Sequence, residues 1–358
     1  MEELLINYLV KNPNVIGMDR IIDLFGIKTR LVFVDGSYDL LGVKDSKVYR
    51  IEVESTLCSV KDNFLYHRLL KEEVEKIDYI NRVITLKNGT KIDIKDKFVW
   101  VGKKYVNIYY KVKEVCDMIV YSNDSDPYSK GWKKKLEEIG MKLFKVEGKL
   151  KRRIDRDSIG KFLTFMTFLD YKCNRFFSGY WEIRIINNHG KLVYRNFCRD
   201  LLEIVVSLNT PLIETHNTYM GIFPRIKPKG TSEMVKRCHL IFIDLDSPKA
   251  IEDIEYIYDK LTRLNLQPSL IGISGGGVHV YYKFDPIDVE EWKKVQVKAL
   301  KFFDKEFKEY KVDMKIKDPP RISRVLGTFN GRKGKISRIW KVIYQPKSLK
   351  SILRVIGQ

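Results

Sequence analysis

The sequence lacks the features that mark several classes of protein. No apolar run approaches the roughly 20 residues that a membrane-spanning helix requires, and Met1-Glu2-Glu3 is not the basic and apolar start of a secretory signal. The 5 cysteines are odd in number and far apart, and no C-x-x-C pair occurs, so neither a disulfide framework nor a zinc ribbon is indicated. We therefore expect a cytoplasmic protein without a membrane partner.

Acidic residues are scarce relative to basic ones. The 66 lysines and arginines exceed the 46 aspartates and glutamates, which gives a formal net charge of +20. Such a surplus opposes compaction by self-repulsion and is typical of proteins that bind a polyanion. A charge-rich thermophilic surface would explain the 31% charged content but not its imbalance. Nucleic acid is therefore the expected partner.

The 358 residues have room for two domains, and 44% hydrophobic content is sufficient for folded cores. A charged stretch without apolar periodicity, VEGKLKRRIDRD (146–157), follows a strand-like run. We predict a basic linker at 149–158, between an amino-terminal α/β domain of residues 1–148 and a carboxyl-terminal domain of residues 159–358.

The carboxyl-terminal domain shows a regular order of predicted elements. β-branched and apolar runs predict four strands, at 240–246, 269–274, 278–284 and 312–316. Amphipathic helical patterns follow the first and third strands, and a glycine triplet joins the second strand to the third. The order β-α-β-β-α-β is the ferredoxin-like arrangement, so we expect an α+β fold with an upstream α/β module.

Alternation along these strands predicts a polar surface. In this topology the first strand lies between the third and the fourth, and residues two apart on a strand share a face. If the aliphatic residues face the helices, Asp244 and Asp246 lie on the open face. His279 on the third strand and Asp313 on the fourth then face the same side. The topology therefore predicts that these four side chains meet.

Three carboxylates that lie close together repel one another and require cations. Carboxylate oxygens suit Mg²⁺ or Mn²⁺, and two such ions can align an attacking hydroxyl with a triphosphate. The turn Gly275–Gly277, with Gly276 at its centre, allows backbone N–H groups to approach phosphate beside Ser274. Each feature alone is commonplace, but their joint order indicates a nucleotide site that includes His279.

Basic residues follow the predicted fourth strand. Arg321, Arg324 and Arg332 supply cations for a triphosphate or a template. In GRKGKISRIWK (331–341) an aromatic residue stands among cations, which suits nucleic-acid binding, and the expected contacts are Lys333, Lys335, Arg338 and Trp340. The alternative is that Trp340 belongs to the core and the cations form a solvated face.

These motifs resemble the archaeo-eukaryotic primase superfamily over about residues 160–340. The family's D-x-D strand, its S-x-x-x-x-H motif and its aspartate ahead of R-x-x-R are similar to IFIDLD (241–246), SGGGVHVYY (274–282) and the segment 312–334. The stretch TYMGIFPRIK (218–227) resembles the family's upstream strand, which implies that Arg225 contacts phosphate.

The carboxyl-terminal segment departs from the family pattern at two points. Leu326 stands where the family often has proline. The third motif also offers two aspartates, of which Asp313 is favoured over Asp318 because Asp318 precedes two prolines in a predicted turn.

The amino-terminal domain resembles the restriction-endonuclease-like fold, whose motif is D-x(n)-E-x-K. The segment 38–55 offers Asp39, Glu52 and Glu54 as a nuclease-like site. Glu54 replaces the lysine that orients the attacking water in that fold. The domain is therefore an active nuclease, an inactive variant or a small docking module.

The resemblance implies a DNA primase or primase–polymerase, a nucleotidyltransferase that uses Mg²⁺ or Mn²⁺. Its catalytic metal ligands would be Asp244, Asp246 and Asp313. The implied partners are single-stranded DNA template, nucleoside triphosphates and a helicase or other replication protein. A repair polymerase or template-independent transferase would use the same site. A DNA-binding replication protein with a vestigial site is a competing hypothesis, and so is a nuclease that acts through the amino-terminal domain.

Overall fold

The computed structural model has an α+β fold that divides into two compact units, residues 1–24 with 28–151 and residues 25–27 with 152–358. The residues that it describes are 2–27, 38–56, 74–78, 83–86, 91–93, 98–101, 104–107, 116–123, 133–134, 136–148, 150–170, 175–344 and 346–357. Helix α5 (Arg156–Thr167) begins within the segment 149–158 that the sequence predicts as a linker, and the carboxylate of Asp155 accepts a hydrogen bond from the N–H of Ser158. An N-cap of this kind fixes the segment to the helix, so residues 152–158 belong to the second unit.

The first unit is built on a five-stranded mixed sheet. Its strands follow the order β1 (Arg20–Asp23), β2 (Leu40–Lys44), β3 (Lys47–Thr56), β9 (Met118–Asn123) and β10 (Lys142–Lys145). β1, β2 and β3 pair antiparallel, whereas β9 lies parallel to both β3 and β10. Five further strands form two smaller sheets, namely β4 (Val74–Asp78), β5 (Val83–Leu86), β6 (Lys91–Asp93), β7 (Phe98–Val101) and β8 (Lys104–Asn107).

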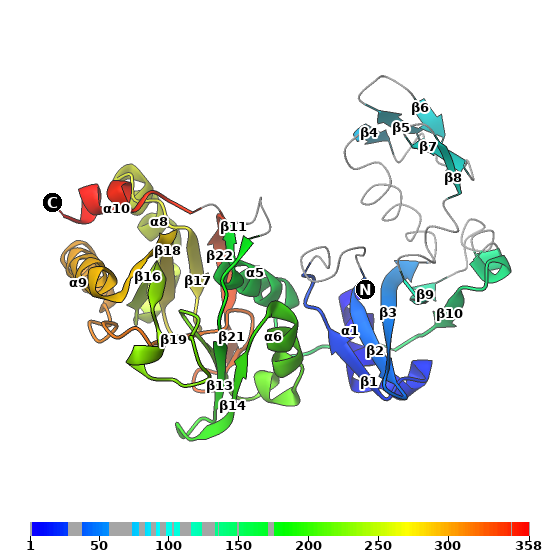
Figure 1. Cartoon of the computed structure of the whole chain (residues 1–358), viewed down its shortest axis with the longest axis horizontal. Helices are drawn as coiled ribbons and strands as arrows, with labels where there is room; N and C mark the ends of the chain where they lie inside the picture. Colours follow the sequence, from blue (N-terminus) through cyan, green and yellow to red (C-terminus); the bar gives the residue numbers. More distant parts are fainter. Residues whose placement is uncertain are drawn as a thin grey trace. The chain divides into compact units, whose positions relative to one another are not determined.

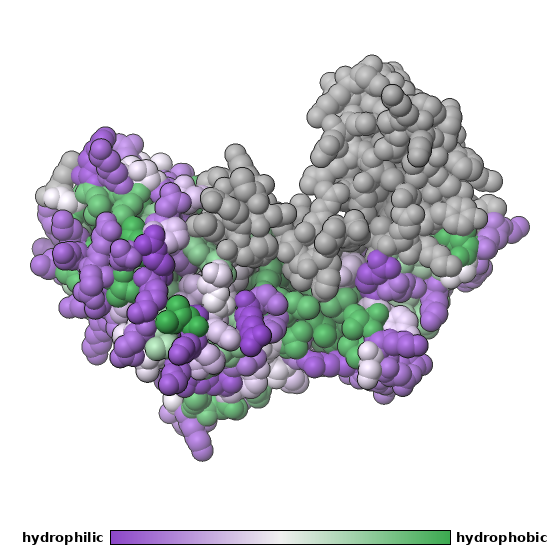
Figure 2. Space-filling view, in the orientation of Figure 1, coloured by the Kyte–Doolittle hydropathy of each residue, from purple (hydrophilic) through white to green (hydrophobic). Residues whose placement is uncertain are grey.

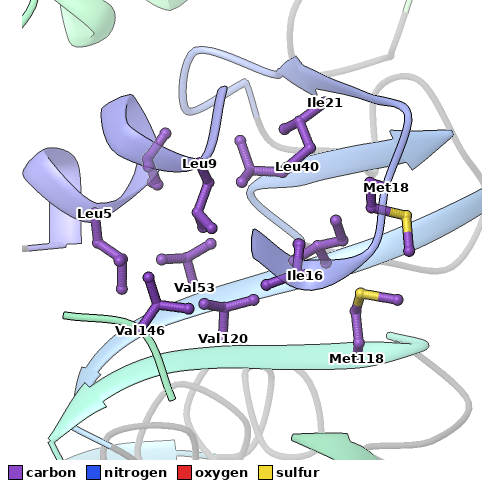
Figure 3. Close-up of a cluster of buried hydrophobic side chains, with 12 residues drawn as sticks. Leu5, Leu9, Ile16, Met18, Ile21, Leu40, Val53, Met118, Val120 and Val146 are labelled. Carbon is purple, nitrogen blue, oxygen red and sulfur yellow. The ribbon is translucent and has the colours of Figure 1, made fainter. Parts of the chain in front are cut away.

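Helix α1 (Glu2–Lys11) packs against this sheet because its apolar residues recur on one face. Leu5 and Leu9 point toward Val53 and Val120 of the central strands, as Figure 3 shows. All four side chains are fully buried. Alternation on β3 therefore places Val53 in the core and Glu52 and Glu54 on the opposite face of the sheet.

The second unit contains two four-stranded sheets. The first, called sheet F here, has the order β14 (Leu192–Cys198), β13 (Trp181–Ile186), β15 (Asn217–Gly221) and β19 (Ile322–Arg324), all antiparallel. Helix α6 (Leu201–Leu208) covers one face of β13 and β14, where Ile183 and Ile185 are buried (Figure 1). The other face of sheet F carries Glu182 and Arg184.

The second sheet, called sheet G, has the antiparallel order β16 (Arg237–Leu245), β18 (Val278–Asp288), β17 (Leu270–Ile273) and β22 (Arg338–Val342). Helix α9 (Val289–Glu306) packs on β16 and β18 (Figure 1). The other α-helices and strands described in the unit are α5 (Arg156–Thr167), β11 (Phe168–Asp170), β12 (Arg175–Phe176), α7 (Pro248–Glu252), α8 (Ile254–Arg263), β20 (Phe329–Asn330), β21 (Lys335–Ile336) and α10 (Leu349–Ile356).

The fourth strand predicted at 312–316 does not form. Val312 makes a single β-bridge with Leu245, and the chain then turns. The carboxylate of Asp313 accepts a hydrogen bond from the N–H of Lys315 (3.0 Å), and this local bond competes with continued strand pairing. β16 is consequently an edge strand along most of its length.

Side chains of α9 satisfy the free backbone edge of β16. The indole N–H of Trp292 donates to the C=O of Leu240 (2.7 Å). The Gln296 side chain accepts from the N–H of Phe242 (3.3 Å) and donates to its C=O (2.7 Å). Both side chains are fully buried. Unpaired backbone groups in this environment would be costly, so α9 replaces the missing strand.

No helix within the described residues is long and apolar enough to cross a membrane. Figure 2 shows that the face of the second unit turned to the viewer is mainly hydrophilic, with small hydrophobic areas.

The hydrogen bonds between Gln296 and the edge of β16 predict how Gln296→Leu affects stability. This substitution retains a side chain of similar size but leaves the N–H and C=O of Phe242 without partners, so it is expected to lower the free energy of unfolding by about 2 to 4 kcal/mol. Lys298→Leu, at an exposed position of the same helix, should change it by less than about 0.5 kcal/mol. Urea unfolding curves of the two variants provide the comparison, and equal shifts would contradict the role given to Gln296.

Candidate active site

A pocket of about 250 Å³ in the second unit is lined by residues of both sheet F and sheet G. It combines three carboxylates with four basic side chains. The lining residues are Tyr219, Phe242, Asp244, Asp246, Ser274, Gly276, His279, Asp313, Ile316, Arg321, Ile322, Ser323, Arg324, Asn330, Arg332 and Lys333. The structure therefore brings together most of the nucleotide-site residues that the sequence predicts.

Backbone pairing holds the three aspartates together. Asp244 lies on β16 opposite His279 of β18, and Asp246 directly follows β16. The N–H of Asp313 donates to the C=O of Asp244 (2.9 Å), and the N–H of Asp246 donates to the C=O of Lys311 (3.0 Å). One short antiparallel contact thus brings Asp313 beside Asp244, although the predicted strand is absent.

The electrostatic environment of Asp244 is unfavourable for a carboxylate. Burial raises the pKa of this group to about 7, and the charges of Asp246 and Asp313 contribute in the same direction. The positive charge of Arg324 lowers the pKa of Asp244, but by less than the other effects raise it. The Asp244 side chain is nevertheless 28% exposed, so it is accessible from the pocket. The negative charges of the three aspartates are therefore not balanced by nearby positive charge, and a bound cation would balance them.

His279 is buried beside these carboxylates and is neutral near pH 7. Burial, followed by the charge of Arg324, lowers its pKa to about 3. Its Nδ1 lies 3.1 Å from the hydroxyl of Tyr281, and its Nε2 lies 3.7 Å from Oδ1 of Asp244. The second contact is consequently not an ion pair. A neutral imidazole in this position can offer a hydrogen bond to a ligand without adding charge.

Arg324 is a buried cation whose hydrogen-bond partners are neutral. Its Nη2 donates to Oδ1 of Asn217 (3.1 Å) and to the hydroxyl of Tyr219 (3.2 Å), and the guanidinium lies 5.0 Å from the centre of the Tyr219 ring. Among the described residues no carboxylate lies within ion-pair distance of Arg324, which is only 6% exposed. An anion in the pocket would therefore find an uncompensated positive charge.

Three further basic residues line the pocket. Arg332 and Lys333 are exposed, and the Arg332 guanidinium lies beside Gly190 at the tip of the β13–β14 hairpin. Arg321 forms an ion pair with Asp318 (2.7 Å). Asp318 itself does not line the pocket, whereas Asp313 does.

The glycine turn has a packing role that the sequence did not indicate. A Cβ atom at Gly277 would lie 2.0 Å from the C=O oxygen of Leu245, so only glycine allows the turn to approach the end of β16. The N–H of Gly277 also donates to Oγ of Ser274 (3.2 Å) within the turn, and therefore does not face a ligand. Gly276 remains at the pocket, next to Lys333.

Arg225, which the resemblance implies as a phosphate contact, does not line the pocket. Its side chain is fully buried and donates to the C=O groups of Phe223 (2.6 Å) and Pro320 (3.0 Å). Nη2 also lies 3.4 Å from the carboxylate of Glu182. These partners make Arg225 a structural cation that joins sheet F to the segment before β19.

The remaining predicted nucleic-acid contacts lie outside the pocket lining. Lys335 is exposed on β21, and Arg338 is exposed on β22. The ring of Trp340 is partly buried and lies 5.2 Å from that of Tyr258 on α8. Trp340 is therefore packed against a helix and is not a free stacking surface.

The three nuclease-like residues lie in the first unit. Oδ2 of Asp39, which precedes β2, accepts a hydrogen bond from the N–H of Val53 (2.9 Å). Glu52 is partly exposed on β3, and Glu54 is buried. Their nuclease-like role stays a prediction.

In the part of the chain that the structure describes, no group of three or more His, Cys, Asp or Glu side chains is arranged so that it could hold a metal ion. This includes the three aspartates of the pocket. Their chemistry nevertheless fits Mg²⁺ or Mn²⁺, because these ions prefer carboxylate oxygens and the raised pKa of Asp244 indicates a deficit of positive charge. Side-chain movement would have to bring the carboxylates together around an ion.

Sequence reasoning missed several polar residues of the site. Tyr219 lines the pocket under Arg324, and Nδ2 of Asn330 donates to the C=O of Ser274 (2.9 Å). Alternation along β15 could have indicated Tyr219, since Thr218 and Met220 point the other way. Alternation does not indicate Asn330, because this residue belongs to a two-residue strand after a loop.

No protein-family model matches the sequence, and no curated protein matches it either. Solved structures are similar to part of the chain. The archaeo-eukaryotic primase domain of the cyanophage S-2L primase–polymerase is 18% identical with a TM-score of 0.41, and the likeness covers 57% of this chain and 99% of that one.

Two structures of the primase RepB′ are also similar. The catalytic domain in complex with initiator DNA is 14% identical with a TM-score of 0.38, over 56% of this chain and 92% of that one. The second RepB′ structure is 15% identical with a TM-score of 0.37, over 56% of this chain and 61% of that one. Likenesses of this size do not assign a function.

The raised pKa of Asp244 predicts a pH-dependent stability. An unfolded aspartate titrates near pH 4, and the folded group titrates near pH 7, so the folded state binds more protons between these values and stability falls as the pH rises through them. Without divalent cations, Asp244→Asn should therefore be more stable than the unsubstituted protein by about 1 to 3 kcal/mol above pH 7, and this gain should disappear near pH 4.

Urea unfolding in the presence of a chelator measures this difference at the two pH values. Asp259→Asn, at an exposed position of α8, is the control and should leave the curves unchanged. A gain for Asp244→Asn that is the same at both pH values would contradict the explanation by charge.

Proposed function

We propose that the second unit is a nucleotidyltransferase of the primase or primase–polymerase type. This proposal rests on one observation, which is that unpaired negative and positive side chains lie in the same pocket. Three mutually repelling carboxylates lie beside a buried guanidinium whose described partners are neutral. A nucleoside triphosphate bound with divalent cations supplies both missing charges at once, because its phosphates suit the arginine and its cations suit the carboxylates.

The residues of the pocket have distinct tasks in this proposal. Asp244, Asp246 and Asp313 would hold Mg²⁺ or Mn²⁺, which when bound supplies charge neutralisation and activation of the attacking hydroxyl. Arg324 would bind the triphosphate from the floor of the pocket, and Arg332 and Lys333 would bind it from the rim. Because Arg324 is already held by Asn217 and Tyr219, little conformational freedom is lost when phosphate binds.

His279 would orient the triphosphate by a hydrogen bond. Its Nδ1 lies at the Tyr281 hydroxyl, so its Nε2 is the ring nitrogen that faces Asp244 and the pocket. The imidazole remains neutral across the working pH range because its pKa is lowered to about 3. It is therefore unsuited to act as a general acid near pH 7, and positioning is the role that its environment supports.

The net charge of +20 supports a single-stranded DNA template as the second substrate. The proposed activity would also call for a helicase or other replication protein as a partner. The competing hypotheses are a DNA-binding protein with a vestigial site and a nuclease that acts through the first unit. A vestigial site has no reason to retain three repelling carboxylates, whose proximity destabilises the fold, so the enzyme is favoured.

The central prediction concerns Asp244→Ala and Asp246→Ala. Each variant should lower nucleotide incorporation by at least about 100-fold while the fold is retained, because both side chains face the pocket. Purified chain is incubated with single-stranded DNA, labelled ribonucleotides or deoxynucleotides, and Mg²⁺ or Mn²⁺, with and without a primer. Asp259→Ala should retain full activity. Incorporation by Asp244→Ala at the unsubstituted rate would refute the proposed site.

A further prediction separates nucleotide binding from template binding. His279→Phe preserves an aromatic ring against Phe242 but removes the N–H donor, so nucleotide affinity should fall about tenfold. Affinity for single-stranded DNA should change by less than about twofold. Fluorescence titrations with a labelled nucleotide and a labelled oligonucleotide measure the two effects. If both affinities fall equally, His279 has a structural role only.

A further inference from the structure

A row of cationic and aromatic side chains crosses sheet F from the pocket to its outer edge. Arg324 on β19 lies opposite Tyr219 on β15, and Tyr219 lies opposite Arg184 on β13. Arg184 in turn lies opposite Arg195 on the edge strand β14. Directly opposed residues share one face of a sheet, so these four side chains form a continuous line, called the arginine row here.

The outer part of the row is accessible to solvent. The side chains of Arg184 and Arg195 are 27% and 38% exposed, whereas Arg324 at the pocket is buried. The opposite face of β13 holds the buried Ile183 and Ile185 under α6, so the row lies on the face that this helix leaves uncovered. Three strand spacings of about 4.8 Å give the row a length of about 14 Å.

A buried carboxylate holds the two outer guanidinium groups in position. Nε of Arg184 and Nε of Arg195 both donate to Oε1 of Glu182, at 2.6 Å and 2.8 Å. Burial by itself would raise the pKa of Glu182, but the hydrogen bond from Arg184 and the charges of the surrounding arginines lower it below its usual range. Glu182 is therefore ionised and anchors both arginines from beneath the surface.

The arginines around Glu182 carry more charge than this residue can compensate. Arg184, Arg195 and the buried Arg225 all lie within ion-pair distance of Glu182. Among the described residues, no other carboxylate lies within ion-pair distance of these three arginines. Two positive charges consequently remain, and N–H donors of the exposed guanidinium groups are left without protein partners among the described residues. Such preorganised donors suit phosphate oxygens.

A neighbouring loop increases the positive charge beside the row. A Cβ atom at Gly230 would lie 2.2 Å from Nη2 of Arg195, so glycine allows the backbone to pass close to both guanidinium groups. Lys227 and Lys229 of the same loop are exposed. The outer end of the row is therefore a local concentration of cations.

We infer that the arginine row binds the phosphate backbone of a single-stranded nucleic acid and leads it into the pocket. Arg184 and Arg195 contact consecutive phosphates, and the ring of Tyr219 offers a surface on which a base can stack between these contacts and Arg324. A single strand is the partner that fits, because the row is one side chain wide and ends inside a pocket. The inference rests on the proposed function, for which this strand is the template.

The test compares two double variants of the full chain that each lose two positive charges. Arg184→Gln with Arg195→Gln removes the outer cations of the row, and Lys294→Gln with Lys298→Gln removes two exposed lysines of α9. At about 50 mM salt the first variant should bind a labelled single-stranded oligonucleotide at least about tenfold more weakly, and its slope of log affinity against log salt should be lower by about 1.4. The second should stay within about twofold.

The contrary result is equally defined. If both double variants lose affinity equally, the protein binds DNA through its general charge, and the row has no special role. Arg184→Lys with Arg195→Lys keeps the charge and the pairing with Glu182, so this variant should retain the salt slope.

Protection from phenylglyoxal, which modifies arginine, provides a measurement on the unsubstituted protein. An oligonucleotide should protect Arg184 and Arg195, as mass spectrometry of the peptides would show, whereas inorganic tripolyphosphate should leave them reactive. Equal protection by tripolyphosphate would assign the row to the triphosphate instead of a strand. Absence of protection by the oligonucleotide would also overturn the inference.

Nucleotide incorporation distinguishes a failure of this inference from a failure of the proposed function. If the protein binds single-stranded DNA through the row but incorporates no nucleotide, the row is supported and the nucleotidyltransferase is refuted. If the protein incorporates nucleotides and the glutamine variant does so with unchanged template affinity, the nucleotidyltransferase stands and the row is refuted.

Discussion

β16 forms one edge of sheet G, and the hydrogen-bond partners that this free edge requires determine much of the second unit. An edge strand in a protein interior must satisfy its outward N–H and C=O groups without a neighbouring strand. Trp292 and Gln296 of α9 do this for Leu240 and Phe242. At the end of the strand the segment 311–313 takes over this task through backbone bonds to Asp244 and Asp246.

The same bonds create the acidic group of the pocket. Because the N–H of Asp313 bonds to the C=O of Asp244, the third carboxylate is held beside the other two by backbone atoms and not by side chains. The resulting repulsion contributes to the raised pKa of Asp244, so it acts against stability near neutral pH. A fold optimised for stability alone would separate these charges. Their retention is the physical reason to regard the pocket as a functional site.

Much of this site could be predicted from alternation on strands. Aliphatic residues at the intervening positions predict that Asp244 and His279 lie on one face of the sheet. In the structure Asp244 and His279 are cross-strand neighbours. Asp313 reaches the same pocket by a route that alternation does not describe, since a single β-bridge and an aspartate turn replace the predicted strand. The sequence pattern does not distinguish a full strand from a single β-bridge, because Val312 lies opposite Leu245 in both.

Other features depend on contacts between segments that are distant in the sequence. Arg225 was implied as a phosphate contact by resemblance, yet its guanidinium bonds to the C=O of Pro320, 95 residues away. Residues 152–158 have the composition of a linker, but the buried ion pair between Arg152 and Glu214 (2.8 Å) joins them to the second unit. Local composition indicates whether a segment is exposed to solvent and which secondary structure it favours. It does not indicate hydrogen bonds or ion pairs with residues that are distant in the sequence.

The two four-stranded sheets of the second unit contribute opposite charges to the pocket. Sheet G and the segment after α9 supply the aspartates, and sheet F supplies Arg324 with its neutral supports, Asn217 and Tyr219. Direct pairing of Arg324 with Asp244 would neutralise both charges and so weaken the attraction of the pocket for phosphate and for cations. The structure avoids this because Arg324 is hydrogen-bonded to Asn217 and Tyr219 within sheet F, where cross-strand register also aligns it with Arg184 and Arg195. Separation of the charges between two sheets therefore keeps the pocket able to bind phosphate and cations at the same time.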